Sequence, residues 1–412
     1  DGAVTAIFMK QFQGDQTTLV LTGVVDGDVL VVSTEDGRIK NKRVPWNREV
    51  VGLASQDRLY ERKKVKPGDS FAFKAYQPII NSVVTIRSSV KDEEEVDVLG
   101  VKQKLLRVEE VPDKVMGPSG PIPLPKLTGW LNKDLSFACS QMEMPDLGTI
   151  LMVRTTREIA LARGTTKVAD IGIKSLIKLS APIANARETN KVVYKVTVKD
   201  DDEPQTVFKT DAKQAVRQVK GNTFELVVKA IRSPEGGDGK EVGDEFRKAN
   251  YYLNSDDAAV RKLAETAVGK ETDPWKKAQK IEQWVFRNVV PDNSVPFATA
   301  SQVAVDRKGD CRHKAMLSAA MCRAVGVPSR TVVGLVYAFD RQTGPVLAFH
   351  MWTEVAVKGA WLAIDGTQGL GSVGADHVKI SDSSWSEAQS LTPLLPVARV
   401  LGKVSMEVVE QE

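Results

Sequence analysis

The fold of the C-terminal part is decided by the sequence KGDCRHKAMLSAAMCRAVGVPSR at residues 308–330. Asp310 is a residue type that often caps the start of a helix, and the residues after it have high helix propensity. Gly326 and Pro328 prevent the helix from continuing. The stretch therefore predicts a helix that begins at Asp310 and ends before Gly326, with Cys311 in its first turn.

This position makes Cys311 a candidate nucleophile. Unpaired backbone amides and the positive end of the helix dipole stabilise a thiolate there. Asp310 opposes this effect unless its carboxylate is occupied in capping the amides. The other two cysteines, Cys139 and Cys322, are predicted to be structural, since most free cysteines are inert core residues. Cys311 and Cys322 lie about 16 Å apart on the predicted helix, too far for a disulfide.

The elements around this helix predict an α+β arrangement. A preceding helix is expected to start at Asp273-Pro274, because aspartate caps helices and proline favours the first helical position. After Gly326 the pattern changes to three β-strands separated by turns. These predicted strands cover residues 330–339, 346–357 and 360–365. Helices followed by an antiparallel sheet are therefore expected in this part of the chain.

The turn at Lys358-Gly359 sets which residues of the last two strands face each other. A two-residue turn places Trp352 opposite Asp365, so that His350 becomes the diagonal neighbour of Asp365 on the same face. A loop with one residue more or fewer would put them on opposite faces. The spacing therefore predicts a hydrogen bond between imidazole and carboxylate.

Cysteine, histidine and aspartate together are the groups of a catalytic triad. The imidazole takes the thiol proton, and the carboxylate fixes the tautomer of the imidazole. The residues therefore indicate a candidate catalytic site at Cys311, His350 and Asp365, while a purely structural role for the strand histidine stays open, because triads are recognised by geometry. A zinc site is the rival interpretation of these residue types, but the sequence lacks paired ligands at the usual short spacing. We expect neither a metal nor a cofactor.

The first 231 residues have the pattern of short β-strands, with turn dipeptides such as Asp26-Gly27 and Pro67-Gly68 between them. A glycine-rich linker at 233–241 separates them from the helical part. We predict four regions in the chain. These are a β-rich N-terminal domain (1–163), a second small β-rich domain (164–235), the catalytic domain (236–390) and a C-terminal extension (391–412).

Composition excludes several classes of protein. Of the 412 residues, 42% are hydrophobic and 27% are charged, which is typical of a globular protein. The net charge of +4 is too small and too dispersed for a nucleic-acid partner. No apolar stretch reaches the roughly 18 residues of a membrane-spanning helix. The sequence leaves the oligomeric state open.

Taken in order along the chain, four segments resemble the transglutaminase-like superfamily. The resemblance covers roughly residues 244 to 370 and implies a papain-like α+β core preceded by β-rich antiparallel domains. The segments are Gly309-Asp310-Cys311 with its helix and RAVGVPSR (323–330), VGLVY (333–337), His350-Met351-Trp352, and LAIDGT (362–367).

The resemblance implies that Cys311 is the nucleophile, His350 the base and Asp365 the orienting acid. The implied reaction is cysteine-dependent acyl transfer on protein or peptide amides through a thioester, by a transglutaminase or a peptidase. The Cys311 backbone N–H is expected to donate to the oxyanion, with Gln302 as a candidate second donor. Trp352 is expected to shield the imidazole from solvent.

One segment departs from the family pattern. Related bacterial domains often carry an acidic residue soon after the cysteine, whereas this chain has Arg312-His313-Lys314. We expect His313 at the surface or beside the site. The alternative function is a catalytically silent binding or scaffold protein of the cell envelope. We expect a bacterial, extracytoplasmic location (periplasmic, secreted or cell-surface), and otherwise a cytoplasmic one, because the β-rich modules and the start at Asp1 suit export.

Overall fold

The structure is a computed structural model, and most of the chain is described in it. By contacts, the chain divides into two compact units. The first unit comprises Asp1–Gly117, Pro121–Lys174 and Ser390–Thr392, and the second comprises Pro118–Gly120, Ser175–Gln389 and Pro393–Glu412. The described residues are 3–13, 16–35, 39–56, 58–78, 80–98, 100–117, 120–122, 124–144, 148–157, 176–235, 239, 241–293, 295, 297–341, 343–386 and 392–412.

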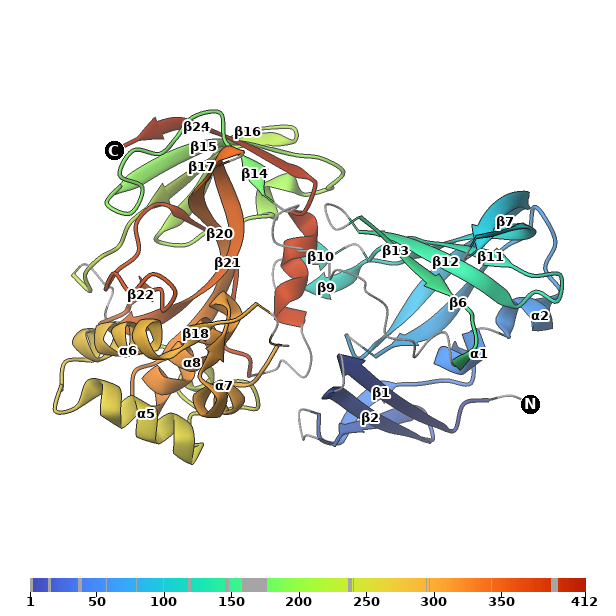
Figure 1. The fold of residues 1–412 in the computed structure, drawn as a ribbon, viewed down its shortest axis with the longest axis horizontal. Coiled ribbons are helices and arrows are strands. Elements are labelled where there is room, and N and C mark those ends of the chain that lie inside the picture. The colour runs from blue at the N-terminus through green and yellow to red at the C-terminus, as the bar shows by residue number, and fades with distance from the viewer. Residues whose placement is uncertain are drawn as a thin grey trace. The chain divides into compact units, whose positions relative to one another are not determined.

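The first unit consists mainly of two β-sheets (Figure 1). One is a four-stranded antiparallel sheet of β1 (Ala6–Gln13), β2 (Gln16–Asp26), β3 (Val29–Thr34) and β4 (Lys42–Pro45). The other has seven strands in the order β13 (Gly148–Val153), β12 (Phe137–Met144), β11 (Leu127–Leu131), β8 (Val101–Pro112), β7 (Ser82–Val98), β6 (Ser70–Gln77) and β5 (Val50–Val51). Short elements complete it: α1 (Leu53–Gln56), α2 (Leu59–Lys63) and the pair β9 (Val115–Gly117) and β10 (Gly120–Ile122). The predicted strand-rich N-terminal half is confirmed.

The second unit combines two larger sheets with a group of helices. Figure 1 shows the helices gathered at one end of the long strands β20 and β21, and a four-stranded sheet at the other end. The first sheet has the order β14 (Ile177–Lys178), β21 (Gly344–Val357), β20 (Ser329–Asp340), β23 (His377–Ser383), with β22 (Ala360–Ile364) paired to β21. The four-stranded sheet has the order β16 (Gln214–Lys220), β17 (Thr223–Lys229), β15 (Lys191–Val198), β24 (Val404–Gln411).

The helices of this unit are α5 (Ala258–Val268), α6 (Pro274–Asn288), α7 (Ala300–Asp306) and α8 (Cys311–Ala324). Shorter elements are the strand pair β18 (Val290–Pro291) and β19 (Lys308–Gly309) and the 3-10 helices η1 (Pro204–Thr206), η2 (Asp244–Phe246) and η3 (Thr392–Arg399). None of the helices among the described residues has the length and apolar character needed to cross a membrane.

The two predicted helix starts are confirmed. Asp273 caps α6, and its side chain accepts a hydrogen bond from the Lys276 amide at 2.9 Å. Asp310 caps α8, and its Oδ1 accepts a hydrogen bond from the Arg312 amide at 2.9 Å. These local bonds satisfy amides that have no partner within a helix. The three predicted strands correspond to β20, β21 and β22.

The two sheets of the second unit share one hydrophobic core. Its buried members include Tyr194 of β15, Leu347 of β21, Val378 of β23 and Met406 of β24. Residues from the predicted second domain and from the predicted C-terminal extension therefore lie in the same compact unit as the helices. The four-region division itself stays a prediction. Its boundary after residue 163 lies outside the described residues, as do residues 236, 390 and 391 at the other two boundaries.

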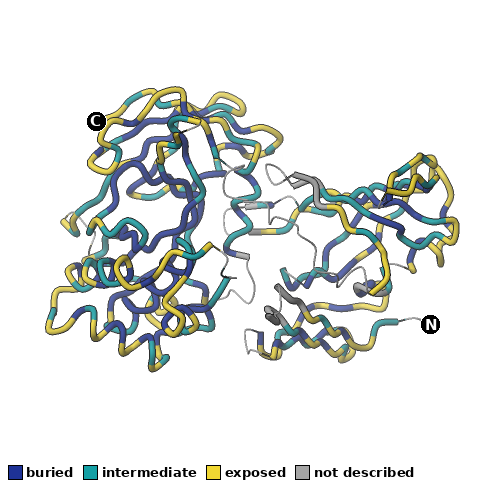
Figure 2. The backbone as a smooth tube through the Cα atoms, viewed as in Figure 1, coloured by how far each residue is buried: buried dark blue, intermediate teal, exposed yellow. Residues whose placement is uncertain are grey.

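Helix α8 is buried along most of its length. Figure 2 shows it together with β20 and β21 as largely buried backbone. The Thr353 hydroxyl of β21 donates a hydrogen bond of 2.9 Å to the Ala315 carbonyl of α8. This buried bond fixes the first turns of the helix against the strand that carries His350.

Candidate active site

Cys311 is the first residue of α8, and its side chain is half-buried. The remaining cysteines, Cys139 and Cys322, are free and buried, as predicted. The Asp310 carboxylate beside the thiol is occupied, because it accepts hydrogen bonds from the Arg312 amide and from Arg312 Nε at 2.8 Å. Burial raises the pKa of Asp310, but its bonds with His313 and Arg312 lower that pKa well below its ordinary value. Asp310 thus caps the helix as an ion-paired carboxylate.

His313 lies beside the site, next to the Asp310 cap, and not at the surface. It is fully buried, and its Nδ1 accepts a hydrogen bond from the Asp310 amide at 3.0 Å. A surface position was therefore wrong, because the third residue of the helix closes a capping box with the N-cap residue. Gly309 makes room for this ring: it has φ +147°, and a Cβ there would meet the ring at 2.4 Å.

The predicted register between β21 and β22 is confirmed. Thr353 pairs with Ile364 and Val357 with Ala360, so the next position along places Trp352 opposite Asp365. The turn residues Lys358 and Gly359 have φ of +52° and +82°. Positive φ at both central residues is the geometry of a two-residue hairpin turn.

This register brings the predicted histidine and aspartate into contact. His350 Nε2 lies 2.9 Å from Asp365 Oδ2, and both side chains are buried. Cys311 also acts on His350, since the thiol contributes to raising the pKa of the imidazole. Because Nε2 faces Asp365, the other ring nitrogen is available to a neighbouring group. The hydrogen-bonded pair of His350 and Asp365 thus lies within electrostatic reach of Cys311.

The groups around His350 favour the charged form of its imidazole. Burial alone would lower the pKa of His350, but the charge and hydrogen bond of Asp365, with smaller contributions from Cys311, raise it to about 10. Burial would raise the pKa of Asp365, and the charge and hydrogen bonds of His350 and His377 lower it well below its ordinary value. An imidazolium held in this way stabilises a neighbouring thiolate.

The raised pKa of His350 predicts a pH dependence of stability. Between pH 6.5 and about 10 the folded chain holds a proton that the unfolded chain has lost, so the free energy of unfolding falls as pH rises through this window. His350→Gln should remove this slope. We expect the wild-type to lose on the order of 2–4 kcal/mol more than the variant between about pH 7 and 10, measured by urea unfolding.

The comparison with the variant is necessary because a second group titrates in the opposite sense. Burial lowers the pKa of Lys213 to about 8, so its contribution rises with pH in part of the same window. That contribution is common to both proteins and cancels. Equal slopes in wild-type and variant would contradict the charged state assigned to His350.

Two side chains that sequence reasoning missed support Asp365. The first is Glu282 of α6, which is fully buried. Its Oε1 accepts from the Asp365 amide at 2.9 Å and its Oε2 from the Gly371 amide at 2.6 Å. Burial raises the pKa of Glu282 to about 7 against the opposing effect of these two bonds. The signal was available: Glu282 lies between Ile281 and Val285, on the buried stripe of the helix.

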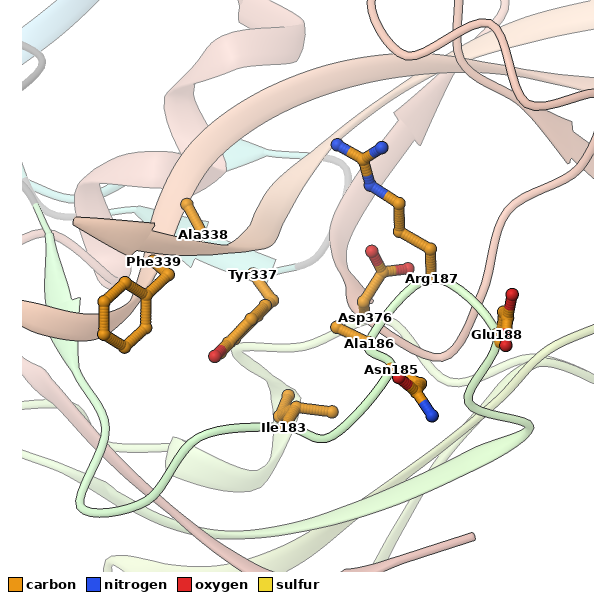
Figure 3. A pocket seen from close by; sticks show the side chains of 9 residues that line it. All are labelled: Ile183, Asn185, Ala186, Arg187, Glu188, Tyr337, Ala338, Phe339 and Asp376. Atoms are coloured by element: carbon orange, nitrogen blue, oxygen red, sulfur yellow. The ribbon is translucent and has the colours of Figure 1, made fainter. Parts of the chain in front are cut away.

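The second is His377, at the start of β23. Its Nε2 lies 3.4 Å from Asp365 Oδ2, and its Nδ1 lies 2.8 Å from Asp376 Oδ1. Figure 3 shows Asp376 in the wall of a cavity of about 390 Å³, together with Arg187 and Tyr337. Only the pairing of β23 with β20 brings His377 to the site, so no local pattern could have revealed it.

Trp352 lies fully buried beside the imidazole, in a position that fits the expected shielding. Its ring stacks on the His350 ring, with centroids 6.3 Å apart and an angle of 22° between the planes. Gly334 of β20 lies against the indole, and a Cβ there would meet the Trp352 ring at 2.6 Å and the Val378 carbonyl at 2.1 Å. The Trp352 indole can therefore occupy this position only because residue 334 has no side chain.

Gln302 is exposed and lies in the first turn of α7. Its Oε1 accepts hydrogen bonds from the Thr299 amide at 2.8 Å and from the Thr299 hydroxyl at 3.2 Å. This is a capping box, and it gives the side chain a local structural role. The part of Gln302 as an oxyanion donor stays a prediction.

Two groups of side chains in the described part of the chain have metal-ligand atoms close together. In the first, the ligand atoms of His350, Asp365 and His377 lie within 4.8 Å of one another. His350 and Asp365 are the hydrogen-bonded pair described above, and His377 is the neighbour of Asp365. These residue types suit zinc, so metal content is a measurement that any account of the site must include.

The second group contains Asp211, Glu354 and Asp382. Cations already pair with it: Lys379 Nζ contacts Asp211 at 2.5 Å and Glu354 at 2.7 Å, and Arg330 contacts Glu354 at 2.7 Å. Lys209 Nζ lies 4.0 Å from Asp382, so three cations face the three carboxylates of this partly buried cluster.

Comparison with known proteins identifies the class of this domain. Residues 261–366 match the model of the transglutaminase-like superfamily, and this transglutaminase-like domain includes Cys311, His350 and Asp365. A protein of unknown function from Haemophilus influenzae is 32% identical over 96 residues, which is 22% of this chain and 26% of that protein. The chain thus spans about a quarter of the length of this curated relative.

Solved structures give weaker likenesses. A candidate cysteine protease from Cytophaga hutchinsonii has a TM-score of 0.35 at 17% identity, over 54% of this chain and 87% of that one. The periplasmic domain of TgpA from Pseudomonas aeruginosa has a TM-score of 0.30 at 13% identity, over 47% of this chain and 87% of that one.

Proposed function

We propose that the chain is an enzyme of cysteine-dependent amide acyl transfer, with a protein or peptide as acyl donor. The observation that carries this proposal is the hydrogen bond of 2.9 Å between His350 Nε2 and Asp365 Oδ2, together with Cys311 at the start of α8, where the thiol helps to raise the pKa of His350. Cys311 begins α8, His350 lies in β21 and Asp365 follows β22. The Asp365 backbone amide is held by Glu282, and its Oδ1 by the Thr367 amide. A papain-like arrangement of helix and sheet belongs to the same proposal.

In the proposed reaction the Cys311 thiolate attacks the carbonyl carbon of an amide. The C–N bond then breaks, and His350 gives its proton to the leaving amine, which leaves a thioester on the sulfur. The Cys311 amide belongs to the first turn of α8, where backbone N–H groups have no partner within the helix, and it stabilises the oxyanion in this proposal. An amine or water then attacks the thioester carbonyl, and His350 takes the proton of this second nucleophile. The C–S bond breaks, which releases the acyl product and restores the Cys311 thiolate.

Substrate and location are also proposals. A protein or peptide acyl donor follows from the transglutaminase-like domain, and the acceptor is an amine in a transglutaminase or water in a peptidase. An extracytoplasmic location fits the periplasmic origin of one of the similar structures. Fractionation of the cells that make the protein, with detection by antibody, tests the location.

The reaction is tested with a fluorescent primary amine and a glutamine-containing protein. Covalent incorporation of the amine supports a transferase, and new fragments of the protein support a peptidase. Either product should disappear after treatment with iodoacetamide, since alkylation blocks the Cys311 sulfur.

The contrary outcome is also measurable. If neither product forms, and Cys311 reacts with iodoacetamide no faster than free cysteine, the chain is a catalytically silent binding or scaffold protein.

A further inference from the structure

His377 joins two carboxylates inside the second unit. The residue is 1% exposed, and Asp376 and Asp365 are almost equally buried. The imidazole stands between them, with Nδ1 at 2.8 Å from Asp376 Oδ1 and Nε2 at 3.4 Å from Asp365 Oδ2. The hydrogen bonds therefore run from His350 to Asp365, then to His377 and Asp376. The proposed reaction does not use His377 or Asp376.

The hydrogen-bond donors around the Asp365 carboxylate indicate the role of the His377 imidazole. Asp365 Oδ1 accepts from the Thr367 amide at 2.8 Å, and Oδ2 accepts from His350. An imidazole that faces a carboxylate oxygen with each nitrogen can donate to both only when both nitrogens carry hydrogen. His377 then supplies a second donor to Oδ2, and the carboxylate is held at both oxygens.

We propose that His377, itself held by Asp376, is a positioning residue that donates from Nε2 to Asp365 Oδ2 and fixes the carboxylate which orients His350. The inference rests on the proposed function and adds to it. His377 lies beyond the end of the region that matches the family model, residues 261–366.

The surroundings of His377 fit a role in positioning. Trp352 meets the His377 ring edge to face at 5.1 Å and stacks on His350, so one indole packs against both imidazoles. The charged groups around His377 come from several elements: Asp365 after β22 and Asp376 before β23 contact it, the His350 ring of β21 meets it edge to face, and Lys213 before β16 interacts with Asp376. Burying this many charges is costly unless each is paired.

The test uses three variants of the full chain. His377→Phe keeps a ring of similar shape but removes both N–H groups. His377→Gln keeps one amide donor that can reach Asp365. Asp376→Asn keeps the imidazole and removes the charge that holds it.

The readout is the rate of Cys311 alkylation by iodoacetamide as a function of pH. It reports the thiolate and its imidazole partner without a substrate, and mass spectrometry of the Cys311 peptide separates it from Cys139 and Cys322. We expect His377→Phe to lower the rate at neutral pH about 10-fold and to move the acidic limb of the profile upward. His377→Gln should recover most of the rate, and Asp376→Asn should fall between the two.

The outcomes separate this inference from the proposed function. If wild-type Cys311 reacts no faster than free cysteine, both fail. If the wild-type reacts fast and His377→Phe and Asp376→Asn keep its profile while His350→Gln loses it, only the inference is overturned. Stoichiometric zinc in the purified wild-type, lost in His377→Phe, would also overturn it by making His377 a metal ligand. Should His377→Phe fail to fold in a thermal melt, Asp376→Asn carries the test, since it keeps the volume of the core.

Discussion

Replacing Cys311 with alanine is expected to remove the acyl-transfer activity, with kcat lowered by about 10⁴-fold or more. Cys139 and Cys322 are both buried, and burial raises the pKa of each thiol, so neither is expected to replace the Cys311 sulfur. The free energy of unfolding should change little, since Cys311 is half-buried and its sulfur fills no enclosed core position. Single-turnover incorporation of the fluorescent amine measures the first effect and urea unfolding the second.

Cys322→Ala is the matched control, with the same substitution in the same helix. Cys322 is fully buried, so its loss leaves a small cavity and costs on the order of 1 kcal/mol of stability. Its activity should stay at the wild-type level. Activity retained in Cys311→Ala, or lost equally in both variants, would show that Cys311 is not the nucleophile.

Asp365→Asn is expected to have the second largest effect, a loss of about 10³–10⁴-fold in kcat. The Thr367 amide donates to Oδ1, so the asparagine must keep its oxygen there and turn its NH₂ toward His350 and His377. The NH₂ group of the asparagine then faces His350 Nε2, which in the wild-type donates to Asp365 Oδ2. The imidazole must adopt the other tautomer, with its hydrogen toward Cys311, and it can no longer take the thiol proton.

The control for this substitution is Asp201→Asn. Asp201 is another buried carboxylate of the same unit, paired with Arg399 at 2.7 Å. This variant should lose stability but keep the pH profile of Cys311 alkylation, whereas Asp365→Asn should displace that profile. Profiles that move together in the two variants would mean that general destabilisation, and not the tautomer of His350, accounts for the loss.

Local chemistry made much of the site predictable. The caps Asp273 and Asp310 determine where α6 and α8 begin, and the turn at Lys358-Gly359 determines the register of β21 and β22. These features depend on residues within a few positions of one another. For that reason the contact of His350 with Asp365 follows from the order of the amino acids alone.

The parts that could not be predicted depend on contacts between distant segments. His377 reaches Asp365 only because β23 pairs with β20, and β24 joins β15 across some two hundred residues of sequence. Glu282 presents a different case. Its charge argued against burial, and backbone amides that donate to it, among them those of Asp365 and Gly371, compensate for that burial.

The short turn between β21 and β22 restricts how this chain can change in evolution. Point substitutions at Lys358 alter only the local backbone, but a single inserted or deleted residue would rotate one strand by half a turn relative to the other. Asp365 would then project from the opposite face of the sheet. Its carboxylate would still be present but could no longer contact His350. Length variants of this turn that remain active should therefore differ from it by even numbers of residues.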